Sequence, residues 1–116
     1  MHAFDVLGDP VRRHLIELLA RGEHAAGDLS DDVRARFGIS QPAVSQHLKV
    51  LREAGFVTVR PEGARRLYAV SPEPLREIDD WLVPFRHFWE PRFAALGTEI
   101  ARGKRARRTS TDKDES

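Results

Sequence analysis

The chain has 116 residues, of which 41% are apolar and 32% are charged, and it contains no cysteine. These values are typical of one globular domain with a modest core, and they exclude a disordered or membrane-embedded chain. Without cysteine there are no disulfides, thiolate metal sites or thiol redox switches. The first residues form no secretory signal and no stretch is long and apolar enough to span a bilayer, so we expect a cytoplasmic protein with no membrane partner.

Positive charge is concentrated in two segments, although the net charge is only +1. Residues 1–101 carry 13 Lys and Arg against 15 Asp and Glu, whereas residues 102–116 carry 6 against 3. Residues 40–70 contain only two acidic residues beside five basic ones, which are Lys49, Arg52, Arg60, Arg65 and Arg66. Such local charge is what nucleic-acid affinity depends on. Residues 102–116 contain almost no apolar side chains, so we expect a disordered basic and polar tail after a domain over residues 1–101.

Capping residues and apolar spacing predict four helices in the first half of the chain. Asp9 followed by Pro10 is an N-cap sequence, and Ser40 is a second candidate N-cap. Gly38 suits the left-handed position that follows a helix. We therefore expect helices over residues 4–7, 10–21, 27–37 and 41–54.

The periodicity then changes from helix to strand. Phe56–Arg60 and Arg66–Val70 are rich in β-branched and aromatic residues, and Pro61–Ala64 between them has the composition of a turn. These segments predict one β-hairpin, so that the fold class is mainly α with a small β-hairpin.

A long apolar stripe follows the hairpin. Between Ser71 and Ile100, apolar residues recur at spacings of three and four, which is typical of a long amphipathic helix. Pro84 and Pro91 lie inside this segment, so we expect a kink or break there rather than a straight helix.

The helix that starts after Ser40 has one apolar and one polar side. Val44, Leu48 and Leu51 lie within about 60° of one another at roughly 100° per residue, which predicts that they are buried. The opposite side carries Pro42, Ser45, Gln46 and Lys49, with Gln41 and Arg52 at its edges. In a DNA major groove Gln46 can pair with an adenine edge, Ser45 with a base or phosphate, and Lys49 with guanine or phosphate. The alternative, from the helix alone, is an ordinary solvated face.

The segment Ile39–Val57, with the sequence ISQPAVSQHLKVLREAGFV, resembles the recognition-helix signature of the ArsR-type winged-helix repressors. The resemblance extends to Asp9–Arg12 and to the hairpin Arg60–Tyr68, and in all it covers roughly residues 3–101. It implies a winged helix-turn-helix with N- and C-terminal dimerisation helices. It also implies a homodimeric repressor that binds a palindromic operator in double-stranded DNA through residues 40–54 and 60–68.

The resemblance places a set of polar residues at DNA-facing positions of the recognition helix, namely Ser40, Gln41, Pro42, Ser45, Gln46 and Lys49. Arg65 and Arg66, beside the glycine-containing turn of the hairpin, can reach the flanking DNA backbone or minor groove. The alternative for this arginine pair is a solubility feature.

Aromatic residues gather near the end of the chain, where Trp81, Phe85, Phe88, Trp89 and Phe93 fall within thirteen residues. A small domain has little core in which to bury them, so we interpret the stripe as a subunit interface that also involves the first helix. The expected interface consists of Phe4, Leu7, Leu82, Phe85, Trp89, Phe93 and Leu96. The pattern from Trp81 to Trp89 resembles a non-metal branch of the family.

The histidines show no metal-binding pattern. His2, His14, His24, His47 and His87 lack the paired histidine and carboxylate spacing of a metal site, so we expect no metal and no cofactor. His47 lies at the border of the apolar side of its helix, which favours a structural role.

No catalytic motif is present, so we do not expect an enzyme. A winged-helix module that binds only proteins is disfavoured by the polar and basic recognition helix, whereas a repressor with a small-molecule or metal effector near the dimer helices remains an alternative.

Overall fold

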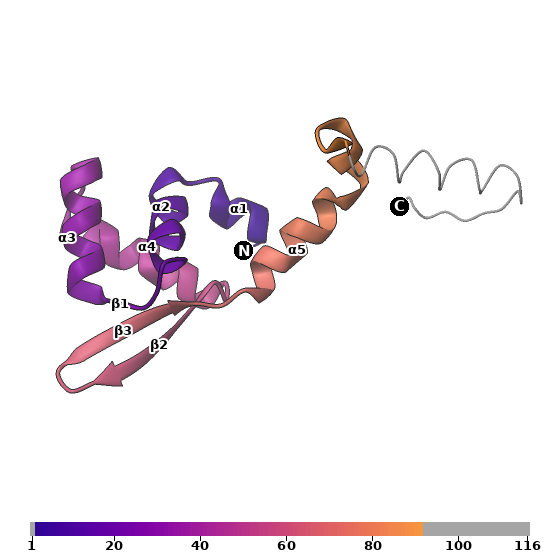
Figure 1. Ribbon diagram of the computed structural model, residues 1–116. Helices are drawn as coiled ribbons and strands as arrows, with labels where there is room; N and C mark the ends of the chain where they lie inside the picture. Colours follow the sequence, from indigo (N-terminus) through magenta and orange to yellow (C-terminus); the bar gives the residue numbers. More distant parts are fainter. Residues whose placement is uncertain (1, 92–116) are drawn as a thin grey trace, which may run out of the picture. The chain divides into compact units, whose positions relative to one another are not determined.

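The computed structural model describes residues 2–91 (Figure 1). Its elements run in the order α1 (Ala3–Leu7), α2 (Pro10–Leu19), β1 (His24–Ala25), α3 (Ala26–Phe37), α4 (Gln41–Glu53), β2 (Val57–Glu62), β3 (Arg65–Val70), α5 (Glu73–Leu82) and the 3₁₀ helix η1 (Val83–Phe88). The chain divides into two compact units, Met1–Ile78 and Asp79–Ser116. The expected tail over residues 102–116 and the expected interface residues Phe93 and Leu96 lie outside the described residues. In the described part, no helix combines the length and apolarity needed to cross a membrane.

The helix boundaries are set by the capping residues identified in the sequence. Asp9 accepts hydrogen bonds at its Oδ1 from the backbone N–H groups of Val11 and Arg12, at 2.8 and 3.2 Å. Ser40 accepts one at its Oγ from the N–H of Ala43 at 3.3 Å. These bonds satisfy donors that a helix N-terminus otherwise leaves without partners. Gly38 ends α3 at φ 67°, a left-handed conformation that glycine adopts without strain.

The sheet has three antiparallel strands in the order β1-β3-β2. The prediction of a hairpin is confirmed, but it omitted β1, which pairs His24 with Tyr68 and Ala25 with Leu67. A strand of two residues is too short to show an alternating pattern, so nothing in the sequence signalled it. The hairpin turn is also tighter than predicted, because β2 continues to Glu62 and only Gly63 and Ala64 connect the strands. We call β2, β3 and their connection the wing; it extends beyond the helices in Figure 1.

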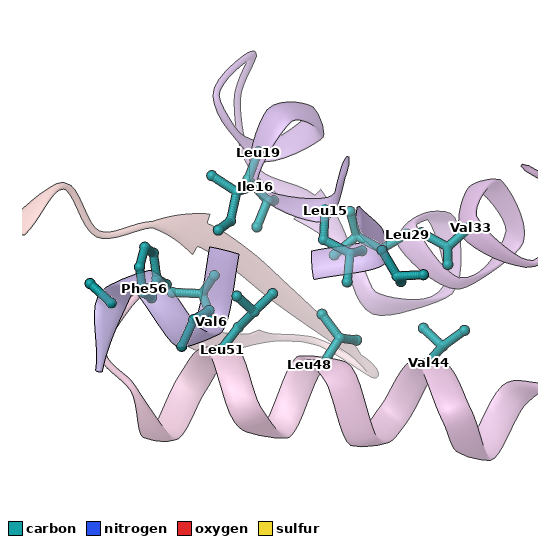
Figure 2. Packing of buried hydrophobic residues seen from close by; sticks show 13 residues of the cluster. Val6, Leu15, Ile16, Leu19, Leu29, Val33, Val44, Leu48, Leu51 and Phe56 are labelled. Carbon is teal, nitrogen blue, oxygen red and sulfur yellow. The ribbon is translucent and has the colours of Figure 1, made fainter. Parts of the chain in front are cut away.

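The core lies between the helices and the sheet of the first unit. Figure 2 shows Val44, Leu48 and Leu51 projecting from α4 toward side chains of α2 and α3. Val44 and Leu51 are fully buried, and Leu48 is 6% exposed. The apolar side predicted from helical spacing is therefore the buried side. Because α4 is held by this side, its other side is presented to solvent.

The apolar stripe after the wing is divided between the core and a second helical segment. Leu75 and Ile78 pack against the core of the first unit. The α-helix ends at Leu82 and a 3₁₀ helix begins at Val83, with Pro84 in its first turn. The predicted break at Pro84 is confirmed, because proline lacks the N–H that an α-helix would require and clashes with the preceding turn.

Candidate nucleic-acid interface

The exposed face of α4 carries all the polar residues expected to contact DNA on this helix. Ser40, Gln41, Pro42, Ser45, Gln46 and Lys49 are each exposed. The face begins at the helix N-terminus, where the partial positive charge of the helix dipole favours anions. Lys49 lies two turns further along and adds a full positive charge.

At the N-terminal end of this face, one side chain is tied to the preceding helix. The Oγ of Ser30 in α3 donates a hydrogen bond to Oε1 of Gln41 at 2.5 Å. Sequence reasoning did not find this contact, because the two residues are separated by the turn between the helices. The signal that was present is the position of Ser30 beside Leu29 on the buried side of α3.

A hollow of about 200 Å³ lies between α3, α4 and β3. Its wall includes Gln41 and Ser45 from the exposed α4 face, and Leu48 and Tyr68 contribute apolar surface. The remaining lining residues are Ala26, Gly27, Ser30 and Asp31, all from α3. The exposed α4 face and the wing thus meet at a concave surface that two DNA-facing candidates share.

The two sides of the wing differ in charge. On one side Arg60 donates two hydrogen bonds to Glu23, from Nε at 3.2 Å and from Nη2 at 2.8 Å. Arg65 lies on the same side, by the alternation of strand residues, with its Nη2 4.0 Å from the Glu62 carboxylate. These contacts partly neutralise the arginines that the sequence presents as one basic cluster.

The Glu23–Arg60 pair also shifts the ionisation of both groups. The hydrogen bonds from Arg60 hold the pKa of Glu23 below its ordinary value, with a smaller contribution from the positive charge itself. The same contacts raise the pKa of Arg60. This pair links β2 to the segment before β1, so Arg60 is partly engaged within the protein.

The opposite side of the wing carries Arg66, which alternates with Tyr68 and pairs across the strands with Pro61. Tyr68 also lines the hollow beside Ser45. Within residues 2–91, no carboxylate lies within 4.0 Å of a nitrogen of Arg66 or Lys49. Lys49 on α4 and Arg66 on the Tyr68 side of the wing are therefore exposed cations that form no ion pair with any described residue.

Comparison with known proteins agrees with this arrangement. The sequence profile described as bacterial regulatory protein, arsR family, matches residues 9–59. The chain is also 30% identical over 84 residues to the transcriptional repressor SdpR of Bacillus subtilis, an alignment that covers 72% of this chain and 89% of that protein. The chain belongs to the ArsR family of bacterial regulatory proteins. It is a DNA-binding transcriptional regulator with the winged helix-turn-helix fold of that family, whose members are regulators rather than enzymes.

Two further relatives extend the comparison. This ArsR-family chain is 47% identical over 73 residues to the HTH-type transcriptional regulator Rv2034 of Mycobacterium tuberculosis; the alignment covers 63% of this chain and 64% of that one, slightly under two thirds of its length. The crystal structure of a possible transcriptional regulator for arsenical resistance matches with a TM-score of 0.61 at 35% identity, covering 85% of this chain and 96% of that one.

Arg12 of this ArsR-family regulator connects the recognition helix, α4, to α1 and α2 through hydrogen bonds. This arginine donates hydrogen bonds to the carbonyl oxygens of Val6 at 2.9 Å and Asp5 at 3.2 Å. Its Nη1 also lies 3.4 Å from Nδ1 of His47 on α4, where it donates because a guanidinium has no acceptor. Asp9 approaches the same ring nitrogen at 4.0 Å. His47 is therefore half-buried and hydrogen-bonded, which agrees with the structural role predicted for it.

The expected interface residues differ in exposure. Phe4 is 42% exposed, Phe85 37% and Trp89 55%, whereas Leu7 and Leu82 are half-buried. Leu7 packs against the core of the first unit. The Phe85 ring lies against the Trp81 ring in a tilted arrangement, with the ring centres 4.8 Å apart. Among the described residues of the second unit, the exposed large apolar side chains are thus mainly aromatic.

No three His, Asp or Glu side chains in the described part of this regulator lie close enough together to hold a metal ion. His14 instead forms a hydrogen bond between its Nε2 and Oδ1 of Asp32 at 2.7 Å, which joins α2 to α3. Sequence reasoning did not find this pair, because the two residues lie in different helices with β1 between them.

Proposed function

We propose that this ArsR-family regulator is a homodimeric repressor that binds a palindromic operator through the exposed α4 face and the wing. The observation that carries the proposal is that Lys49 on the exposed α4 face and Arg66 on the wing belong to one compact unit and form no ion pair within the described residues. A helix with such a face fits the major groove, while a cation on an adjoining hairpin fits the flanking backbone or minor groove. The name of SdpR, a transcriptional repressor, supports repression rather than activation. Such a protein acts in the cytoplasm, where the bacterial chromosome lies.

Each proposed contact has a distinct chemical role. Ser40, Pro42 and Ser45 surround the helix N-terminus, where short side chains allow a close approach of the DNA backbone. Gln46 offers both a donor and an acceptor, the combination that pairs with the N6 and N7 atoms of adenine. Lys49 and Arg66 contact phosphates, with Arg65 in a lesser role because Glu62 lies beside it.

Homodimerisation rests on the exposed aromatic residues of the second unit. Phe85, Phe88 and Trp89 are 37%, 71% and 55% exposed, which is unusual for large apolar side chains in a small protein. We assign Phe4, Leu7, Leu82, Phe85 and Trp89 to the subunit interface, and we add Phe93 and Leu96 from their spacing alone. A two-fold dimer places two recognition helices about one DNA turn apart, which matches a palindromic site.

Selection of bound duplexes from a randomised double-stranded DNA library tests the DNA-binding proposal. The protein is expected to enrich an inverted repeat whose half-sites are about one helical turn apart. Gln46→Ala is expected to relax the preference at one base pair of each half-site, with the other positions unchanged. If Gln46→Ala enriches the same sequence with the same stringency, Gln46 does not read a base.

Ultracentrifugation of Phe85→Glu and Trp89→Glu tests the dimer. Each substitution places charge in the proposed interface, so both variants are expected to sediment as monomers and to bind the full palindrome poorly. Glu77→Gln, on the exposed surface of α5, serves as a control that stays dimeric. If the Phe85 and Trp89 variants remain dimers, the interface lies elsewhere.

A further inference from the structure

Ser30 is the one polar residue in the described part of the chain that is buried, with 3% of its surface exposed. It lies in α3 between the buried residues Leu29 and Val33. A hydroxyl group in such a place destabilises the fold unless it forms a hydrogen bond. An alanine would fit the same position and is a better helix former. The hydroxyl therefore calls for an explanation beyond packing.

The hydroxyl of Ser30 donates its hydrogen bond to Oε1 of Gln41, the first residue of α4. A glutamine amide has two different ends, because the oxygen accepts hydrogen bonds and the NH2 group donates them. Gln41 is itself exposed, so with its oxygen engaged by the buried Ser30 the NH2 group is the end of the amide that remains for a ligand. The contact thus decides which end of the amide is available to a ligand.

We infer that Ser30 is a positioning residue that makes Gln41 a hydrogen-bond donor toward DNA. This inference rests on the proposed function and specifies the chemistry of one of its contacts. Gln41 then recognises an acceptor, which is either a base edge (O6 or N7 of guanine, O4 of thymine) or a phosphate oxygen. The paired contact with adenine needs both ends of an amide, so Gln41 does not make it, whereas Gln46 retains both ends for that purpose.

The surroundings of Gln41 explain why positioning matters. Gln41 borders the hollow between α3, α4 and β3, which leaves a long, rotatable side chain room to adopt other conformations. Ordering such a side chain during binding reduces affinity. The hydrogen bond from Ser30 orders it beforehand, so that less conformational entropy is lost when DNA binds.

Side-chain NMR relaxation of the free protein tests the positioning without any DNA. The Gln41 amide nitrogen is expected to be rigid in the native chain and mobile in Ser30→Ala, while the exposed Gln46 amide is mobile in both and serves as an internal control. If the Gln41 amide has the same mobility in both proteins, Ser30 does not position it and the inference is wrong.

A double-mutant cycle with a duplex selected from the randomised library tests the consequence for binding. Ser30→Ala and Gln41→Ala are each expected to weaken binding by about 25-fold, because about five-fold, the value of one ordinary hydrogen bond, is lost in each protomer of the dimer. The double variant is expected to bind no worse than Gln41→Ala alone, because Ser30 acts only through Gln41. An equal loss from Ser30→Ala in both backgrounds shows a general structural effect on α3 and overturns the inference.

Gln41→Glu tests the donor role. Glutamate keeps an oxygen that accepts from Ser30 and suits a helix N-terminus, so the variant is expected to fold as stably as the native chain. It has no NH2 group and adds a negative charge, so it is expected to bind the selected duplex more weakly than Gln41→Ala. Binding equal to that of the native chain overturns the donor assignment.

The two sources of the acceptor give different results. If the acceptor is a base, the loss caused by Gln41→Ala is confined to duplexes with one particular base pair. If it is a phosphate, the loss is the same for all selected sequences and is reproduced by one methylphosphonate linkage. Failure of the proposed function is recognisable separately, since in that case the native chain selects no duplex at all while the NMR result still stands.

Discussion

Replacement of Lys49 by alanine tests the electrostatic part of DNA recognition. Lys49 is exposed on α4, and within the described residues no carboxylate lies within 4.0 Å of its ammonium group. Its positive charge is therefore available to a phosphate. Alanine is a better helix former than lysine, so we expect no loss of folding stability from the substitution itself.

The magnitude follows from counterion release. Each phosphate contact contributes about 0.9 to the slope of log K against log salt, so loss of one contact in each protomer of a dimer lowers the slope by about 1.8. At about 0.1 M salt, a slope of about 0.9 means that losing one contact weakens binding about 8-fold. Losing two contacts then weakens it about 60-fold. Fluorescence anisotropy titrations of a selected duplex at several salt concentrations measure both quantities.

A matched control separates local from general charge effects. Arg21→Ala removes one positive charge in the turn after α2, the helix against which the buried side of α4 packs. We expect this variant to keep nearly the native slope and affinity. If Lys49→Ala keeps the native slope, or if Arg21→Ala lowers the slope equally, then Lys49 makes no phosphate contact. The assignment of the exposed α4 face to DNA binding is then wrong.

Three further outcomes are expected. Arg66→Ala is expected to weaken binding several-fold more than Arg65→Ala in the same titration, because Glu62 lies beside Arg65; equal losses would contradict the assignment of the two wing sides. The lowered pKa of Glu23 means that its pair with Arg60 stabilises the fold above the ordinary pKa of glutamate and that this stabilisation is lost as the pH falls through the lowered value. In Arg60→Gln the pKa of Glu23, followed by NMR, is expected to rise, and an unchanged value would rule out the pair in solution. Leu51→Ala is expected to lower the free energy of unfolding by about 2–5 kcal/mol in urea denaturation, because it leaves a cavity beneath α4; a loss under about 1 kcal/mol would mean that this side of α4 is loosely packed.

The features that the sequence predicted correctly depend on residues close together in the chain. Asp9 and Ser40 cap helices through bonds to N–H groups two or three residues away. Gly38 needs only its own backbone conformation to end α3. The two sides of α4 follow from the helical period, which is why the exposed side was identified residue by residue. Pro84 interrupts its helix by its own covalent structure.

The features that the sequence did not predict join residues that are distant in the chain. Glu23 and Arg60 are 37 positions apart, and Arg12 and His47 are 35 apart. Each is an ordinary polar residue in its own segment, so no local pattern marks the pair. The strand β1 is defined only by its pairing with β3. Ser30 came closest to being predictable, because a hydroxyl group on the apolar side of α3 implies a hydrogen-bond partner. The sequence around Ser30 does not show that this partner is Gln41.

The central claim is that the exposed α4 face and the Arg66 side of the wing contact duplex DNA. Amide hydrogen exchange of the free protein and of its complex with a selected duplex measures this directly. Protection on binding is expected over residues 40–49 and 63–66, with little change over α2. Protection confined to α2 or to the second unit, with α4 and the wing unaffected, would contradict the account.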